Sequence, residues 1–283
     1  MVTFGVLLIA IVAQVPEHQT GLEQYAAKKY AAAAESFRKS MAAEKAGTRE
    51  HAESAVLLGQ SLYLLGRYEE AIPALNAAPR TNEAAYMLGN SYLKLHDMQH
   101  SVQAFAEMFG VPARSAAAHL IAAQMMMHQE LNEEAEAQLL QAIALNAQLP
   151  RAHYLLGELY LFRGAAEQAA AQLKMEIAIN PDSAMAYYKL GDVYGRQSQW
   201  DAAIPVLQKS IWLDATNSGP YMLLGKAYLQ KKELSNAEGM LRRAVQLDPR
   251  NSSAHYLLGQ TLMREGREEE GKAMFTLSQK LKN

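Results

Sequence analysis

Leucine-glycine pairs recur along this chain at a regular interval. The glycines of these pairs are separated by 30, 68, 34, 34 and 34 residues, and 68 is twice 34. Ala123, another small residue, stands halfway along the long interval. The small residues of the series are Gly59, Gly89, Ala123, Gly157, Gly191, Gly225 and Gly259. A fixed period of this length predicts a stack of repeated structural units.

Two further positions keep the same period. Twelve residues after each small residue the side chain is small again, at Ala71, Ser101, Ala135, Ala169, Ala203, Ala237 and Gly271. Sixteen residues after it the side chain is large and apolar, at Leu75, Phe105, Leu139, Leu173, Leu207, Leu241 and Phe275. Within each unit the apolar residues recur at helical spacing on both sides of a turn signal such as Leu65–Tyr68. Each unit is therefore predicted to be a helix hairpin whose small residues permit close approach of the two helices.

Composition supports a helical, well-packed chain and argues against several functions. Of the 283 residues, 50% are hydrophobic and 20% are charged, which is enough apolar material for a continuous core. The net charge of −2 offers no basic surface for a phosphate backbone, so we expect no nucleic-acid partner. The absence of cysteine excludes disulfides, thiolate metal sites and thiol nucleophiles.

The amino-terminal segment differs from the repeats. Between Val2 and Ala13 only Thr3 is polar, and this run is shorter than the ~20 residues of a membrane-spanning helix. Its length suits an export signal ending near Ala13, although no Lys or Arg precedes it and Ile11 stands where a small residue is preferred. We expect an exported, periplasmic protein without a membrane span. The alternative is an apolar helix that caps the first repeat of a cytoplasmic protein.

The repeat pattern resembles the tetratricopeptide repeat family, whose 34-residue unit combines Leu-Gly, Tyr, Ala, a large apolar residue and Pro. The best copies are 186–214, with Leu190, Gly191 and Tyr194, and 220–249, with Leu224 and Gly225. The resemblance implies an all-α, right-handed α-solenoid of about eight stacked helix-turn-helix repeats. The predicted organisation is 1–15 as signal peptide or apolar leader, 16–51 as a degenerate first repeat suggested by Tyr30, Ala33 and Phe37, and seven repeats at 52–81, 82–115, 116–149, 150–183, 184–217, 218–251 and 252–283.

An array of this kind presents a concave surface lined by the first helix of every unit, and this groove is the predicted binding site for a protein or peptide. Positions three before and one, four or five after the small residue point away from the second helix. The predicted groove residues are Gln60, Tyr86, Asn90, Gln124, Tyr154, Glu158, Phe162, Tyr188, Asp192, Arg196, Lys226, Tyr256, Gln260 and Arg264. Tyrosines at these positions can either contact the partner or pack within the scaffold itself.

Two ligand classes of the family are not expected here. Members that clamp the carboxyl terminus of chaperones use Lys three before the Gly and Asn one after it, whereas this chain has Tyr86 with Asn90. The asparagine ladder of glycosyltransferase-associated arrays is replaced by residues such as Leu57 and Leu155.

No catalytic constellation or cofactor motif stands out, so we predict no enzyme, no metal and no cofactor. His96, Asp97 and His100 are divided between a turn and a helix, and His153 and His255 occupy packing positions. The favoured hypothesis is a protein-interaction scaffold. The alternative is a self-assembling structural solenoid or an assembly cofactor of the cell envelope. Self-association is compatible with both hypotheses.

Overall fold

The computed structural model describes residues 16–282, and all regular structure in this range is helical. The predicted export signal therefore lies outside the described residues. Two compact units follow one another along the chain, and the division falls between Gln129 and Glu130, inside the predicted repeat 116–149.

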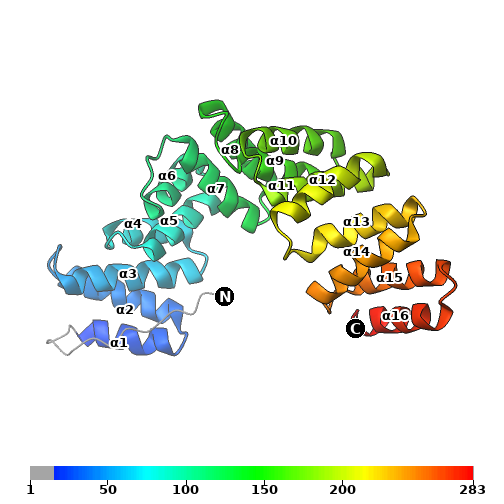
Figure 1. Cartoon of the computed structure of the whole chain (residues 1–283). Coiled ribbons are helices and arrows are strands. Elements are labelled where there is room, and N and C mark those ends of the chain that lie inside the picture. Colours follow the sequence, from blue (N-terminus) through cyan, green and yellow to red (C-terminus); the bar gives the residue numbers. More distant parts are fainter. Residues whose placement is uncertain (1–15, 283) are drawn as a thin grey trace. The chain divides into compact units, whose positions relative to one another are not determined.

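The first unit contains three helix hairpins and one further helix, coloured blue to green in Figure 1. Within each hairpin the two helices pack together, and the second helix also packs against the first helix of the next hairpin. The helices are α1 (Pro16–Ala26), α2 (Tyr30–Ala43), α3 (Arg49–Leu64), α4 (Tyr68–Ala77), α5 (Asn82–Lys94), α6 (Met98–Met108) and α7 (Ala116–His128).

The second unit contains one helix followed by four hairpins with the same pattern of contacts (Figure 1). The helices are α8 (Asn132–Leu145), α9 (Ala152–Phe162), α10 (Ala166–Ile179), α11 (Ala184–Arg196), α12 (Trp200–Leu213), α13 (Ser218–Gln230), α14 (Leu234–Leu247), α15 (Ser252–Arg264) and α16 (Glu268–Lys280). None of the helices in 16–282 combines the length and the apolar character needed to cross a bilayer.

The recurring glycines face the large residue sixteen positions later. A methyl group on Gly191 would lie 2.5 Å from Cδ2 of Leu207, and one on Gly89 would lie 2.5 Å from Cε1 of Phe105. Such distances are far inside van der Waals contact, so only glycine allows the two helices of a hairpin to approach this closely. The predicted reason for the period is therefore confirmed at these positions.

The degenerate first repeat follows the same register more closely than Tyr30, Ala33 and Phe37 alone suggest. Gly21 of α1 stands twelve residues before Ala33 and sixteen before Phe37, and a methyl group on it would lie 2.6 Å from the Phe37 ring. Its spacing of 38 residues from Gly59 conceals it from a search for the period of 34.

Polar contacts also fix this first hairpin. His18 is buried in α1, and its Nδ1 lies 2.8 Å from Oγ of Ser54 in α3. The hydroxyl groups of Ser40 and Ser54 donate to Oε1 of Glu44, at 2.8 and 3.2 Å. The buried carboxylate thus links the end of α2 with α3, and the imidazole joins α1 to the same network.

The turn that follows a first helix has a left-handed residue seven positions after the small residue. Glycine fills this position at Gly66, Gly164 and Gly266, and other residues fill it at Lys28, His96, Glu130, Ser198 and Lys232. The recurrence shows that the turn geometry belongs to the repeat and does not depend on glycine.

First helices begin at capping side chains. Thr48, Thr81, Ser115, Ser183, Asn217 and Asn251 each accept a hydrogen bond from a backbone N–H of the first turn. In α9 the corresponding position is Leu149, which has no acceptor, and the helix begins two residues later than the register of α11 predicts.

Candidate functional site

The predicted groove residues of the first unit lie on α3, α5 and α7 and are not equally available. Tyr86 is 41% exposed, and Gln60 and Gln124 are half-buried. Asn90 is only 1% exposed; its amide donates to the carbonyl of Tyr86 at 2.9 Å, and its side-chain oxygen accepts from Gln129. Asn90 is therefore a poor candidate for partner contact, because its side chain is satisfied inside the chain.

In the second unit α9 and α11 bring Tyr154, Glu158 and Tyr188 together. The Tyr154 hydroxyl is hydrogen-bonded to Glu158, one turn further along α9, and Lys189 of α11 forms an ion pair with Glu158 at 2.8 Å. Burial raises the pKa of Tyr154 above its ordinary value, and the charge and hydrogen bond of Glu158 raise it further. The phenol therefore remains a hydrogen-bond donor at neutral pH.

Tyr188 contributes to the scaffold as well as to this surface. Its ring lies against the start of α13, where a methyl group on Gly219 would stand 2.6 Å from the ring. Burial, followed by the charge of Asp192, raises the pKa of Tyr188. Asp192 is itself paired with Arg196 at 3.1 Å.

A hollow of about 290 Å³ lies on α13 and α15, and the end of the chain contributes to its lining. Its apolar lining comes from Met222, Leu223 and Leu257, and Tyr256 contributes a ring that is 46% exposed. Lys226 and Lys282 also line the hollow. Two of the predicted groove residues, Lys226 and Tyr256, thus meet at a concave surface.

The remaining predicted residues of α15 have intramolecular partners. The amide of Gln260 donates to the Tyr256 hydroxyl at 3.2 Å. The guanidinium of Arg264 donates to the carbonyl of Leu229 at 3.1 Å, at the C-terminal end of α13. Sequence periodicity places these residues on the first helices but does not reveal such contacts between neighbouring repeats.

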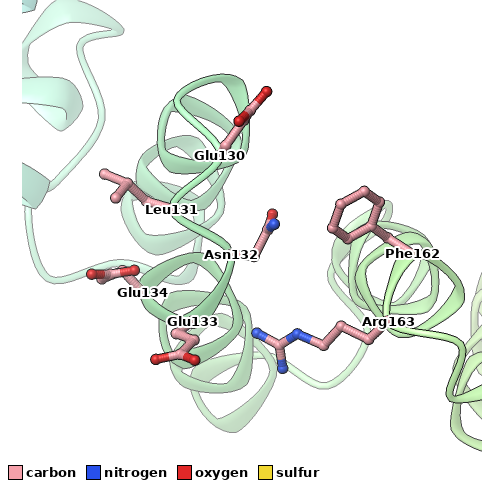
Figure 2. Close-up of a pocket in the computed structure, with 7 residues that line it drawn as sticks. All are labelled: Glu130, Leu131, Asn132, Glu133, Glu134, Phe162 and Arg163. Atoms are coloured by element: carbon pink, nitrogen blue, oxygen red, sulfur yellow. The ribbon is translucent and has the colours of Figure 1, made fainter.

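Phe162 lies at a second hollow, of about 340 Å³, between the end of α9 and the start of α8. Figure 2 shows its ring beside Asn132, with Arg163 extending from α9 toward the first turn of α8. Glu130, Glu133 and Glu134 line the same hollow. Phe162 is 78% exposed, whereas Arg163 forms an ion pair with Glu136.

The repeat register agrees with a family model. A model described as "Tetratricopeptide repeat" matches residues 86–150, 129–184, 154–220 and 222–271, which together make up more than half of the chain. The chain belongs to the tetratricopeptide repeat family. A second model, "Anaphase-promoting complex, cyclosome, subunit 3", matches residues 26–108 of this tetratricopeptide repeat protein. A search of the curated proteins found no match.

Solved structures of similar fold include other repeat proteins. MamA 41-end from Desulfovibrio magneticus RS-1 is 24% identical with a TM-score of 0.55, and the match covers 59% of this chain and 94% of MamA. A structure titled "YrrB: a TPR protein with an unusual peptide-binding site" is 19% identical with a TM-score of 0.55, covering 64% of this chain and 93% of YrrB. At these identities the likeness concerns the fold.

Four histidines of this tetratricopeptide repeat protein lie at packing, capping or turn positions. His153 and His255 are buried, as predicted, and bind Gln172 and the carbonyl of Pro249. Asp97 caps α6 and bonds to His100 at 2.7 Å, while His96 adopts the left-handed turn conformation. Residues 16–282 contain no group of three or more His, Cys, Asp or Glu placed to hold a metal ion.

Proposed function

We propose that this tetratricopeptide repeat protein is an interaction scaffold that holds a peptide segment of a partner protein on the first helices of its second unit. The observation that carries the proposal is the hollow on α13 and α15, where an exposed tyrosine ring and two lysines surround apolar side chains. Such a surface offers contact area and polar groups to an extended or helical segment. The similar fold of YrrB, a tetratricopeptide repeat protein with an unusual peptide-binding site, supports this proposal.

The surface of α9 and α11 extends this binding region along the second unit. Tyr154, Glu158 and Lys189 already form a bonded group, so their polar atoms are fixed before a ligand arrives. A prearranged group loses little conformational freedom on binding, which favours recognition of a peptide backbone.

The test is capture of partners from native extract with the full chain, followed by mass spectrometry. A surface variant combining Tyr154→Ala and Glu158→Ala is compared with Met175→Ser/Trp212→Ser, which changes exposed side chains on the second helices α10 and α12. The proposal expects a captured protein to be lost with the first variant and retained with the second. Loss with the second variant alone would assign binding to the second helices.

Circular dichroism must show that both variants remain folded. Tyr188 is left unchanged because its ring packs against Gly219, and its removal would disturb the contact between α11 and α13.

We also propose that the protein acts outside the cytoplasm, on the strength of the apolar run from Val2 to Ala13. Amino-terminal sequencing of protein isolated from its native cells tests this proposal. A mature start near Gln14 is the expected result, and an intact Met1 in the cytoplasmic fraction would contradict it.

A further inference from the structure

The hollow on α13 and α15 differs in its charges from the surface of α9 and α11. On α9 and α11 the charged groups neutralise one another, since Lys189 pairs with Glu158 and Arg196 pairs with Asp192. Lys226 and Lys282 have no carboxylate partner among residues 16–282. The ammonium nitrogen of Lys226 lies 5.8 Å from the centre of the Trp200 ring.

The two lysines line the hollow together with apolar side chains; Lys226 is half-buried and Lys282 is exposed. Met222, Leu223 and Leu257 line the hollow, and Tyr256 leaves almost half of its side chain exposed there. An apolar anchor would remove this surface from water, and anions beside it would gain charge-assisted hydrogen bonds from the lysines.

We propose that this hollow binds an internal acidic segment of a partner protein, in which an aromatic or aliphatic side chain is flanked by Asp or Glu. The inference rests on the proposed function and specifies its ligand. The anchor enters between Leu223, Leu257 and Tyr256, and the flanking carboxylates pair with Lys226 and Lys282.

The arrangement favours acidic side chains over a free carboxyl terminus. The positions three before the glycine, from which carboxylate-clamping repeats present lysine, hold Met222 and Tyr256 here. The lysines instead come from two separate elements, α13 and the segment after α16, so two separate anions match them better than one terminal carboxylate.

The test measures binding of a synthetic peptide, acetyl-Glu-Glu-Leu-Phe-Glu-Glu-amide, to the full chain. The chain has two tryptophans, so Trp212→Phe leaves Trp200 as a single fluorophore beside Lys226. We expect saturable binding by fluorescence anisotropy of the labelled peptide, together with a change in Trp200 emission. The same peptide with Lys in place of Glu should not bind, and added salt should weaken the binding of the acidic peptide.

Charge reversal in the hollow is compared with a matched reversal elsewhere. Lys226→Glu/Lys282→Glu should lower the affinity for the acidic peptide by about tenfold or more, because like charges then face each other. Lys232→Glu/Lys280→Glu makes the same change in net charge at two exposed lysines outside the hollow and should leave the affinity unchanged. Equal loss with both pairs, or no loss with the first, would overturn the proposal.

Two further outcomes would assign the hollow differently. If binding requires a free carboxyl terminus on the peptide, the ligand is the end of a partner chain and not an internal segment. A dimer of the unliganded protein that dissociates on Lys226→Glu/Lys282→Glu, measured by analytical ultracentrifugation, would assign the hollow to a second copy. If the acidic peptide shows no binding while Tyr154→Ala/Glu158→Ala still abolishes partner capture, the result supports the proposed function and rejects the acidic ligand.

Discussion

The carboxylate of Glu176 lies across the start of α9, where its two oxygens accept the backbone N–H of Arg151 at 2.9 and 3.0 Å. One of the oxygens also accepts the N–H of Tyr154 at 3.2 Å. Glu176 belongs to α10 and is 1% exposed, so a residue of the second helix caps the first helix of its own hairpin. It replaces the side-chain cap that Leu149 cannot provide.

Glu176→Ala should destabilise the second unit by about 2 to 4 kcal/mol, because it removes charge-assisted bonds and leaves backbone donors without an acceptor. Hydrogen exchange followed by mass spectrometry should show faster exchange at the start of α9. Ser210→Ala is the control at the equivalent position of the next repeat, where the hydroxyl only donates to the carbonyl of Ala184. A cost no greater than that of Ser210→Ala would show that the cap contributes little.

Gly191→Ala and Gly239→Ala should change stability in opposite directions. A methyl group on Gly191 meets Leu207 at 2.5 Å, so the substitution forces the α11–α12 hairpin apart and should cost about 1 to 3 kcal/mol. A methyl group on Gly239 of α14 meets nothing within 4 Å and should stabilise by about 0.5 to 1 kcal/mol. Urea unfolding of the two variants measures both changes. Equal destabilisation would contradict the close-approach explanation of the period.

The hairpin architecture was predictable because small and large residues recur at fixed offsets, and each offset corresponds to one contact such as Gly191 with Leu207. The role of Glu176 was not predictable, since its partner lies on another helix and the only local signal was an apolar Leu149 at a capping position. For the candidate site, periodicity placed Lys226 and Tyr256 on first helices. It could not show that Asn90 is buried or that Lys282, beyond the last helix, reaches the same hollow as Lys226.

Lys232→Gly should stabilise the second unit by about 0.5 to 1 kcal/mol, because Lys232 has a φ of +63° at the left-handed position of its turn. Gly164→Ala is the reverse substitution at the same repeat position, where φ is +76° and a methyl group meets nothing within 4 Å. Its expected loss of about 1 kcal/mol would arise from backbone conformation alone. Thermal unfolding monitored by circular dichroism distinguishes the two signs, and a loss with Lys232→Gly would refute the expectation.

The last hairpin should lose stability in acid through the pair of Glu238 in α14 with Arg267. The guanidinium of Arg267 contacts Glu238 at 2.7 Å and Glu270 at 2.7 Å. Burial acts to raise the pKa of Glu238, but hydrogen bonds from Arg267 and Arg242 outweigh it and lower that pKa below its ordinary value of 4.5. Because the folded state holds the carboxylate charged, this stabilisation is complete above pH 4.5 and is lost as pH falls through the lowered pKa.

Glu238→Gln should therefore lower the unfolding temperature near neutral pH, and the variant and the unmodified protein should converge in strong acid. Glu167→Gln is the control, because Glu167 is exposed and forms no ion pair within residues 16–282. Thermal unfolding across the acidic range measures both differences. A deficit of Glu238→Gln that persists unchanged below the lowered pKa would mean that the amide disturbs packing, and that the ion pair is not the source of the stability.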